Sequence, residues 1–163
     1  MGAVEERDTE DMGWLNRISF RLAERAPWLI GIPIRLMARA ARRFPDRALS
    51  LMMRSLPEPD RVVLDERHQM AGLFRDDVIE ALRSGGRGWA WEALMYARPG
   101  GFPLEEIAME VHLWHGEEAT NVPILMARRQ ADAIPNCRAI YYSGEGHLCA
   151  VNRIDEIVRA LCQ

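Results

Sequence analysis

The sequence predicts an α/β fold with a large helical part and a small parallel sheet. Up to Pro103, apolar residues recur at intervals of three and four, which is the period of an amphipathic helix. After Pro103 the pattern changes to strand, helix, strand, helix. A helix that connects two strands implies that they run parallel. We therefore divide the chain into an acidic tail (1–13), a helical region (14–103) and a strand–helix region (104–163).

Prolines divide the helical region into short helices, because proline removes a backbone donor and clashes with the preceding turn. The breaks fall at Pro27, Pro33, Pro45, Pro57 and Pro59. We expect helices at about 14–26, 34–43, 46–55, 60–71, 73–83 and 88–97, with a glycine-rich loop at 84–88. Trp89, Trp91 and Tyr96 in the last helix are expected to pack against the sheet, with lining of a substrate pocket as the alternative.

The strand–helix region contains two strand candidates, residues 110–114 and 138–142. A helix is expected between them at 121–133, capped by Thr120 or Asn121 and with Pro123 in its first turn. A last helix is expected at 152–161. Two parallel strands are few, because parallel sheets are normally covered on both faces and built from many strands. The strand that should lie beside residues 110–114 is therefore expected to be missing from this chain.

The composition describes one globular domain and excludes several classes of protein. The 163 residues are 48% hydrophobic and 28% charged with a net charge of −3, unlike a disordered chain, a collagen or a disulfide-rich miniprotein. Every basic residue is arginine, which excludes lysine-based Schiff-base and P-loop chemistry. Cys137, Cys149 and Cys162 form no zinc-type or disulfide pattern, and no signal or membrane-spanning segment is found. We expect a cytoplasmic protein without a metal.

Residues 14–54 contain nine arginines, with only Glu24 and Asp46 as acids. We favour solvated faces of helices whose other faces are buried. An amphipathic segment on an anionic membrane surface is given less weight. Nucleic acid is not expected as a partner, because no aromatic–basic recognition pattern accompanies the charge.

Two motifs follow the predicted strands. Residues 111–118 read Val-His-Leu-Trp-His-Gly-Glu-Glu and lead to Asn-Val-Pro at 121–123, and residues 141–147 read Tyr-Tyr-Ser-Gly-Glu-Gly-His. This resembles the end of an α/β-hydrolase, in which one strand ends in His-Gly-x-x-Asp-x-x-Val-Pro and the next in Gly-x-Gly-His. The motifs cover the last 60 residues. The helical region resembles the family's cap only in general character.

The resemblance implies a Ser-His-Asp hydrolase of small hydrophobic ester or amide substrates that needs no cofactor. Its base would be His147, because the carboxyl ends of parallel strands meet at the active site. Ala119 stands at the acid position, and Glu118 could substitute only by a shift of the loop. No G-x-S-x-G is present, and Ser143 is a turn serine. The nucleophile half of the family would precede residue 1.

We therefore expect a catalytically incomplete hydrolase-like chain. The alternatives are a non-catalytic interaction or ligand-binding module, a half-enzyme that completes a partner's sheet, or a truncated gene product. Expected partners are a small hydrophobic ligand, a second copy of the chain or a complementary amino-terminal hydrolase half. His112 and His115 are three apart on a strand and point to opposite faces, so no metal site is expected there.

Overall fold

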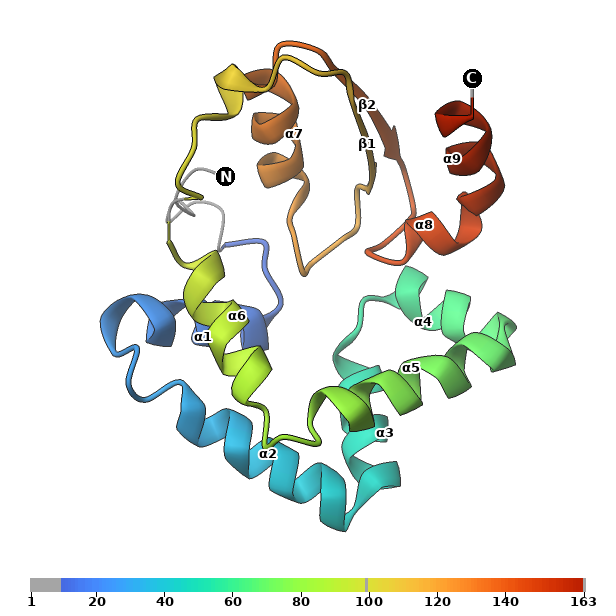
Figure 1. Ribbon diagram of the computed structural model, residues 1–163. Helices are drawn as coiled ribbons and strands as arrows, with labels where there is room; N and C mark the ends of the chain where they lie inside the picture. Colours follow the sequence, from blue (N-terminus) through green and yellow to red (C-terminus); the bar gives the residue numbers. More distant parts are fainter. Residues whose placement is uncertain (1–9, 99, 163) are drawn as a thin grey trace.

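The computed structural model describes residues 10–98 and 100–162 (Figure 1). The helical region forms α1 Trp14–Arg25, α2 Gly31–Arg43, α3 Pro45–Ser55, α4 Glu58–Glu66, α5 His68–Ala81 and α6 Arg87–Tyr96. After a 3₁₀ turn at Leu104–Glu106, the chain forms β1 Val111–Gly116, α7 Ile124–Ala133, β2 Cys137–Tyr142, α8 Cys149–Asn152 and α9 Ile154–Leu161.

Strands β1 and β2 pair in parallel, as predicted, with Val111 opposite Cys137 and Gly116 opposite Tyr142. Over the described part of the chain they form a sheet of two strands. The molecule is thus mainly helical with one small parallel sheet, which agrees with the α/β class. The other edge of β1 has no strand partner among the described residues.

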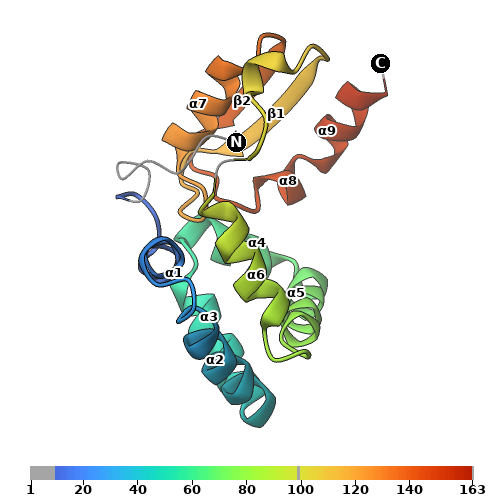
Figure 2. The same cartoon turned by 60° about the vertical axis from the view of Figure 1, so that its left-hand side comes forward.

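Helices α7 and α9 lie on opposite sides of the strands (Figure 2). Side chains alternate along a strand, so His115 and its partner Tyr141 share one face. The guanidinium of Arg128 in α7 lies 5.3 Å from the centre of the Tyr141 ring, so this face is turned toward α7. On the other face, the Tyr142 hydroxyl donates a hydrogen bond of 2.7 Å to Glu156 in α9.

The helical region has small cores rather than one large core. Ala23, Ile30 and Ile34 are buried between α1, α2 and α6. A second cluster joins α2 to the end of α5 and consists of Ala38, Ala41 and Leu82. Gly86 turns the chain between α5 and α6 with a φ of 73°, and a methyl group there would lie 2.4 Å from Cγ2 of Ile34. Only glycine can therefore make this turn against α2.

Several predicted boundaries are wrong. Helix α7 begins at Ile124, with Pro123 before it in extended conformation, and neither Thr120 nor Asn121 caps it. The reason is that a residue preceding proline is disfavoured in the helical conformation, so Val122 cannot extend the helix backwards. Helices α4 and α5 meet at Arg67, several residues before the expected boundary, where neither glycine nor proline marks the break.

The other end of the chain also differs in detail. The expected last helix is divided at Arg153, and α8 begins before it, at Cys149. The Arg153 guanidinium is held by Glu145 and lies over the Tyr142 ring, so this residue faces the sheet at the break. Strand β1 continues through His115 and Gly116, beyond its predicted end.

The prediction for the aromatic residues of α6 is wrong as well. This helix packs on α1 and α2 instead of on the sheet. Trp91 and Tyr96 are 62% and 51% exposed, because the small residues Ala90, Ala93 and Ala97 make the contact with α1 and α2. None of the described helices has the length and apolar character needed to cross a bilayer.

Candidate functional site

The loops that follow β1 and β2 lie side by side at the carboxyl end of the sheet. The backbone N–H of Glu117 donates to the Tyr142 carbonyl at 3.0 Å, and that of Glu118 donates to the Glu145 carbonyl at 2.9 Å. A methyl group at Gly116 would lie only 2.1 Å from the carbonyl oxygen of Gly146. The two loops are therefore in direct backbone contact, and glycine is required where they meet.

His147 lies in the second of these loops, directly before α8, and its side chain is exposed. No described side chain forms a hydrogen bond with its ring. The position after the strand is the one that the sequence predicts for a base. The loop that contains His147 contacts the loop after β1, residues 117–123, which we call the acid-position loop because it contains Ala119. No carboxylate of the described residues orients the His147 ring.

The acid-position loop supplies no carboxylate to His147 over the described residues. Ala119 is 4% exposed, and its N–H closes a turn onto the Gly116 carbonyl at 3.2 Å. Glu118 meets the His147 loop through its backbone, while its side chain is exposed. Glu117 forms an ion pair with Arg128 of α7 at 3.2 Å. The two carboxylates beside Ala119 are thus turned to solvent or to α7.

A carboxylate that the sequence analysis missed contacts the His147 loop from the helical region. Asp60, in the first turn of α4, is 1% exposed. Its Oδ1 accepts a hydrogen bond of 2.8 Å from the backbone N–H of Leu148, while Oδ2 is buried and has no hydrogen-bond partner among the described residues. A methyl group at Gly146 would lie 2.3 Å from Asp60 Oδ1. Asp60 therefore binds the backbone directly after His147 and lies close against Gly146 directly before it.

No signal in the sequence distinguishes Asp60 from an ordinary acid at a helix start. It follows Pro57-Glu58-Pro59, and carboxylates are common in the first turn because they interact favourably with the helix dipole. Such residues are normally exposed. Asp60 is buried because α4 contacts the β2–α8 loop, and its hydrogen bond to Leu148 joins residues that are 88 positions apart in the sequence.

His115 lies at the end of β1 on the face toward α7. Both of its ring nitrogens are buried, and neither forms a hydrogen bond with a described residue. Burial lowers the pKa of His115, and the charge of the nearby His147 lowers it further. The neighbouring backbone of Gly116 and Val122 acts in the opposite direction. The net effect is a pKa of His115 below its ordinary value.

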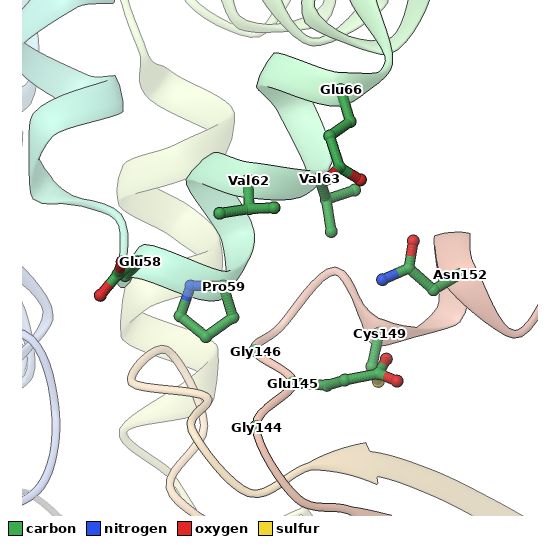
Figure 3. Close-up of a pocket in the computed structure, with 10 residues that line it drawn as sticks. All are labelled: Glu58, Pro59, Val62, Val63, Glu66, Gly144, Glu145, Gly146, Cys149 and Asn152. Carbon is green, nitrogen blue, oxygen red and sulfur yellow. The ribbon is translucent and has the colours of Figure 1, made fainter.

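A cavity of about 320 Å³ opens between α4 and the β2–α8 loop (Figure 3). Its lining consists of Glu58, Pro59, Val62, Val63, Glu66, Gly144, Glu145, Gly146, Cys149 and Asn152. Glu145 accepts a hydrogen bond of 2.8 Å from Nε of Arg153. His147 is not among the lining residues.

Cys149 lines this cavity but is unsuited to act as a nucleophile. Its side chain is buried, and this burial, together with the charge of Glu145, raises the pKa of the thiol. A nucleophilic cysteine requires the opposite, a lowered pKa near a basic group. Ser143 lies in an exposed turn that Gly144 completes with a φ of 75°, and it has no base beside it in the described structure.

The two strand histidines do not form a metal centre. The Nε2–H of His112 donates to the Glu110 carboxylate at 2.7 Å, and its ring stacks on Trp114 on the face away from α7. His115 lies on the opposite face, as the strand period predicts. Within the described residues, no group of three or more potential ligands could hold a metal ion.

Comparison with protein-family models, with curated protein sequences and with solved structures found no match.

Proposed function

We propose that the chain is the carboxy-terminal part of an α/β-hydrolase-like system that supplies the histidine base and requires a complementary half for catalysis. The observation that carries this proposal is the backbone contact between the loops after β1 and β2. In a triad hydrolase, an acid and a base from neighbouring loops must meet in this way. The loop after β2 carries His147 at the motif position of the base.

The same loops indicate why the chain alone should be a poor enzyme. Without an acid, an imidazole loses both the tautomer control and the charge stabilisation that the third member of a triad supplies. Ala119 is buried and cannot be replaced by Glu118 unless the turn closed by the Gly116 carbonyl opens. The nucleophile, too, must come from elsewhere, because Ser143 lies in an exposed turn away from a base.

The outer edge of β1 supports a complementary half as the partner. The N–H groups of Val111 and Glu117 point toward β2, where they donate to the Asn136 and Tyr142 carbonyls. Backbone groups alternate along a strand, so those of His112 and Trp114 point away from β2. No described residue pairs with that edge as a strand. An unpaired edge is a template for a further strand.

The first experiment is an ester-hydrolysis assay of the full chain with p-nitrophenyl butyrate, together with labelling by a fluorophosphonate probe. We expect turnover at the level of the buffer blank and no covalent label. Turnover that disappears in both Ser143→Ala and His147→Gln would show a complete site in the chain and overturn the proposal. Leu73→Ser, at an exposed position of α5, is the control for general effects of substitution.

The second experiment tests complementation. The chain is co-expressed with a separate segment of an α/β-hydrolase that contains the nucleophile turn and ends before its cap. Co-purification and ester hydrolysis that His147→Gln abolishes would support the proposal. Co-purification with undiminished hydrolysis in His147→Gln would favour the alternative, a non-catalytic module that binds through its strand edge.

A further inference from the structure

The outer face of α2 carries exposed apolar side chains in a regular row. Trp28, in the turn before α2, is 77% exposed, and Ile32 and Leu36 are 51% and 65% exposed. Ile32 and Leu36 are four residues apart in α2, so they lie on the same face of the helix, and Trp28 lies in the turn before its first residue. The buried residues Ile34 and Ala38 occupy the opposite face, against α3 and α6. Helix α2 is therefore apolar on both faces, whereas the sequence pattern alone predicts a solvated outer face.

A second row, of arginines, runs beside this apolar row. Arg35, Arg39 and Arg43 are also four residues apart, and all are exposed. Arg42 is exposed as well, but its guanidinium donates to the Leu82 carbonyl at 3.3 Å. Residues 25–45 contain five arginines and no carboxylate, so no acid of this segment neutralises the row.

The position of α2 leaves this face open. The helix packs on α3 and α6 and runs along the outer margin of the helical region, far from the sheet (Figures 1 and 2). Strands β1 and β2 lie at the other end of the molecule, and the loops of the candidate site lie between these strands and the helical region (Figure 1). A complementary strand added beside β1 would therefore not explain the exposed row on α2.

We infer that the face formed by Trp28, Ile32, Leu36, Arg35, Arg39 and Arg43 binds the surface of an anionic lipid bilayer. Tryptophan and aliphatic side chains enter the boundary between headgroups and acyl chains, while arginines beside them contact lipid phosphates. The helix would lie on the membrane rather than cross it. The charge favours this occupant over a second copy of the chain, because two such arginine rows would repel each other.

Flotation with vesicles tests the inference. Vesicles of equimolar phosphatidylcholine and phosphatidylglycerol are compared with vesicles of phosphatidylcholine alone. We expect the full chain to float with the anionic vesicles only, and raised salt to release it. The triple variant Arg35→Gln/Arg39→Gln/Arg43→Gln should bind about 100-fold more weakly, from the attraction of three arginines to an anionic surface.

A matched control carries the same change of charge at exposed positions outside α2: Arg61→Gln, Arg87→Gln and Arg159→Gln. Equal loss of binding in this control would show non-specific attraction and overturn the inference. Ile32→Ser/Leu36→Ser should also weaken binding, while Leu73→Ser/Leu161→Ser should not. Circular dichroism verifies that each variant is folded.

Quenching by brominated phospholipid reports whether Trp28 enters the bilayer. The fluorescence of the full chain should be quenched on anionic vesicles, and Trp28→Phe should lose a large part of this quenching. Binding without any contribution of Trp28, or binding to heparin but not to vesicles, would contradict the inference. The latter result would identify a general polyanion surface.

Discussion

Replacing Gly116 by alanine tests the contact between the two loops of the candidate site. The added methyl would lie 2.1 Å from the Gly146 carbonyl oxygen and 2.4 Å from that of Glu145. Both neighbours are backbone atoms, so no flexible side chain can move aside. The loops would have to separate by roughly 1 Å to relieve the overlap.

This separation sets the size of the effect. The hydrogen bond from Glu118 to Glu145 would lengthen from 2.9 Å to about 3.9 Å, beyond hydrogen-bond range. The bond from Glu117 to Tyr142 would weaken with it. Two lost hydrogen bonds cost about 1 kcal/mol each, and overpacking costs about 1–3 kcal/mol. We expect Gly116→Ala to lower the free energy of unfolding by about 3–5 kcal/mol, a large share of the roughly 5–15 kcal/mol of a typical domain.

The assay is urea unfolding followed by circular dichroism, with hydrogen exchange of the Glu118 amide as the local readout. Gly72→Ala is the matched control, because no heavy atom lies within 4 Å of its added methyl and the residue is inside α5. It should stabilise the chain by about 0.5–1 kcal/mol. A loss below about 1 kcal/mol in Gly116→Ala, with unchanged protection of Glu118, would refute the proposed loop contact.

Other predictions concern Asp60, His115 and assembly. Asp60→Ala should cost about 1–3 kcal/mol of stability, because it removes the acceptor of the Leu148 N–H. Asp60→Asn should cost less, because it keeps an acceptor oxygen. Equal losses of stability for the two variants in urea unfolding would contradict this role. Burial lowers the pKa of folded His115 below its unfolded value of 6.5, so the unfolded chain binds the proton more readily. Stability should therefore fall as the pH decreases through 6.5. His115→Gln should reduce this dependence of stability on pH, and an unchanged dependence would exclude the effect. The open edge of β1 predicts self-association at micromolar concentration, and a sharp monomer peak in size-exclusion chromatography with light scattering, independent of concentration, would count against it.

The sequence predicts much of the local structure correctly. The change of hydrophobic period near Pro103 separates the helices from the strands, and the helix between β1 and β2 makes the pair parallel. These features depend on side-chain period and on proline, which act over a few residues. The helix boundary at Arg67 has no such signal, and it was not found.

The candidate site is predicted only in part. The glycines around His147 correctly indicate a loop after a strand, because glycine allows close backbone approach, and the structure shows that approach at Gly116 and Gly146. The roles of His147 and Glu118 in catalysis stay predictions. Asp60 was missed because its contact with Leu148 spans 88 residues, and nothing in its local sequence distinguishes it.

By itself, the sequence determined which segments are helix or strand, where glycine permits a tight turn, and that the strands are parallel. The tertiary structure decided which apolar residues are buried. Leu36 and Trp91 have the same helical spacing as core residues but remain exposed, since the small residues Ala38 and Ala93 occupy the packed faces. Local period shows that a helix has two faces, but burial depends on which neighbouring helix approaches, and distant parts of the chain set that approach.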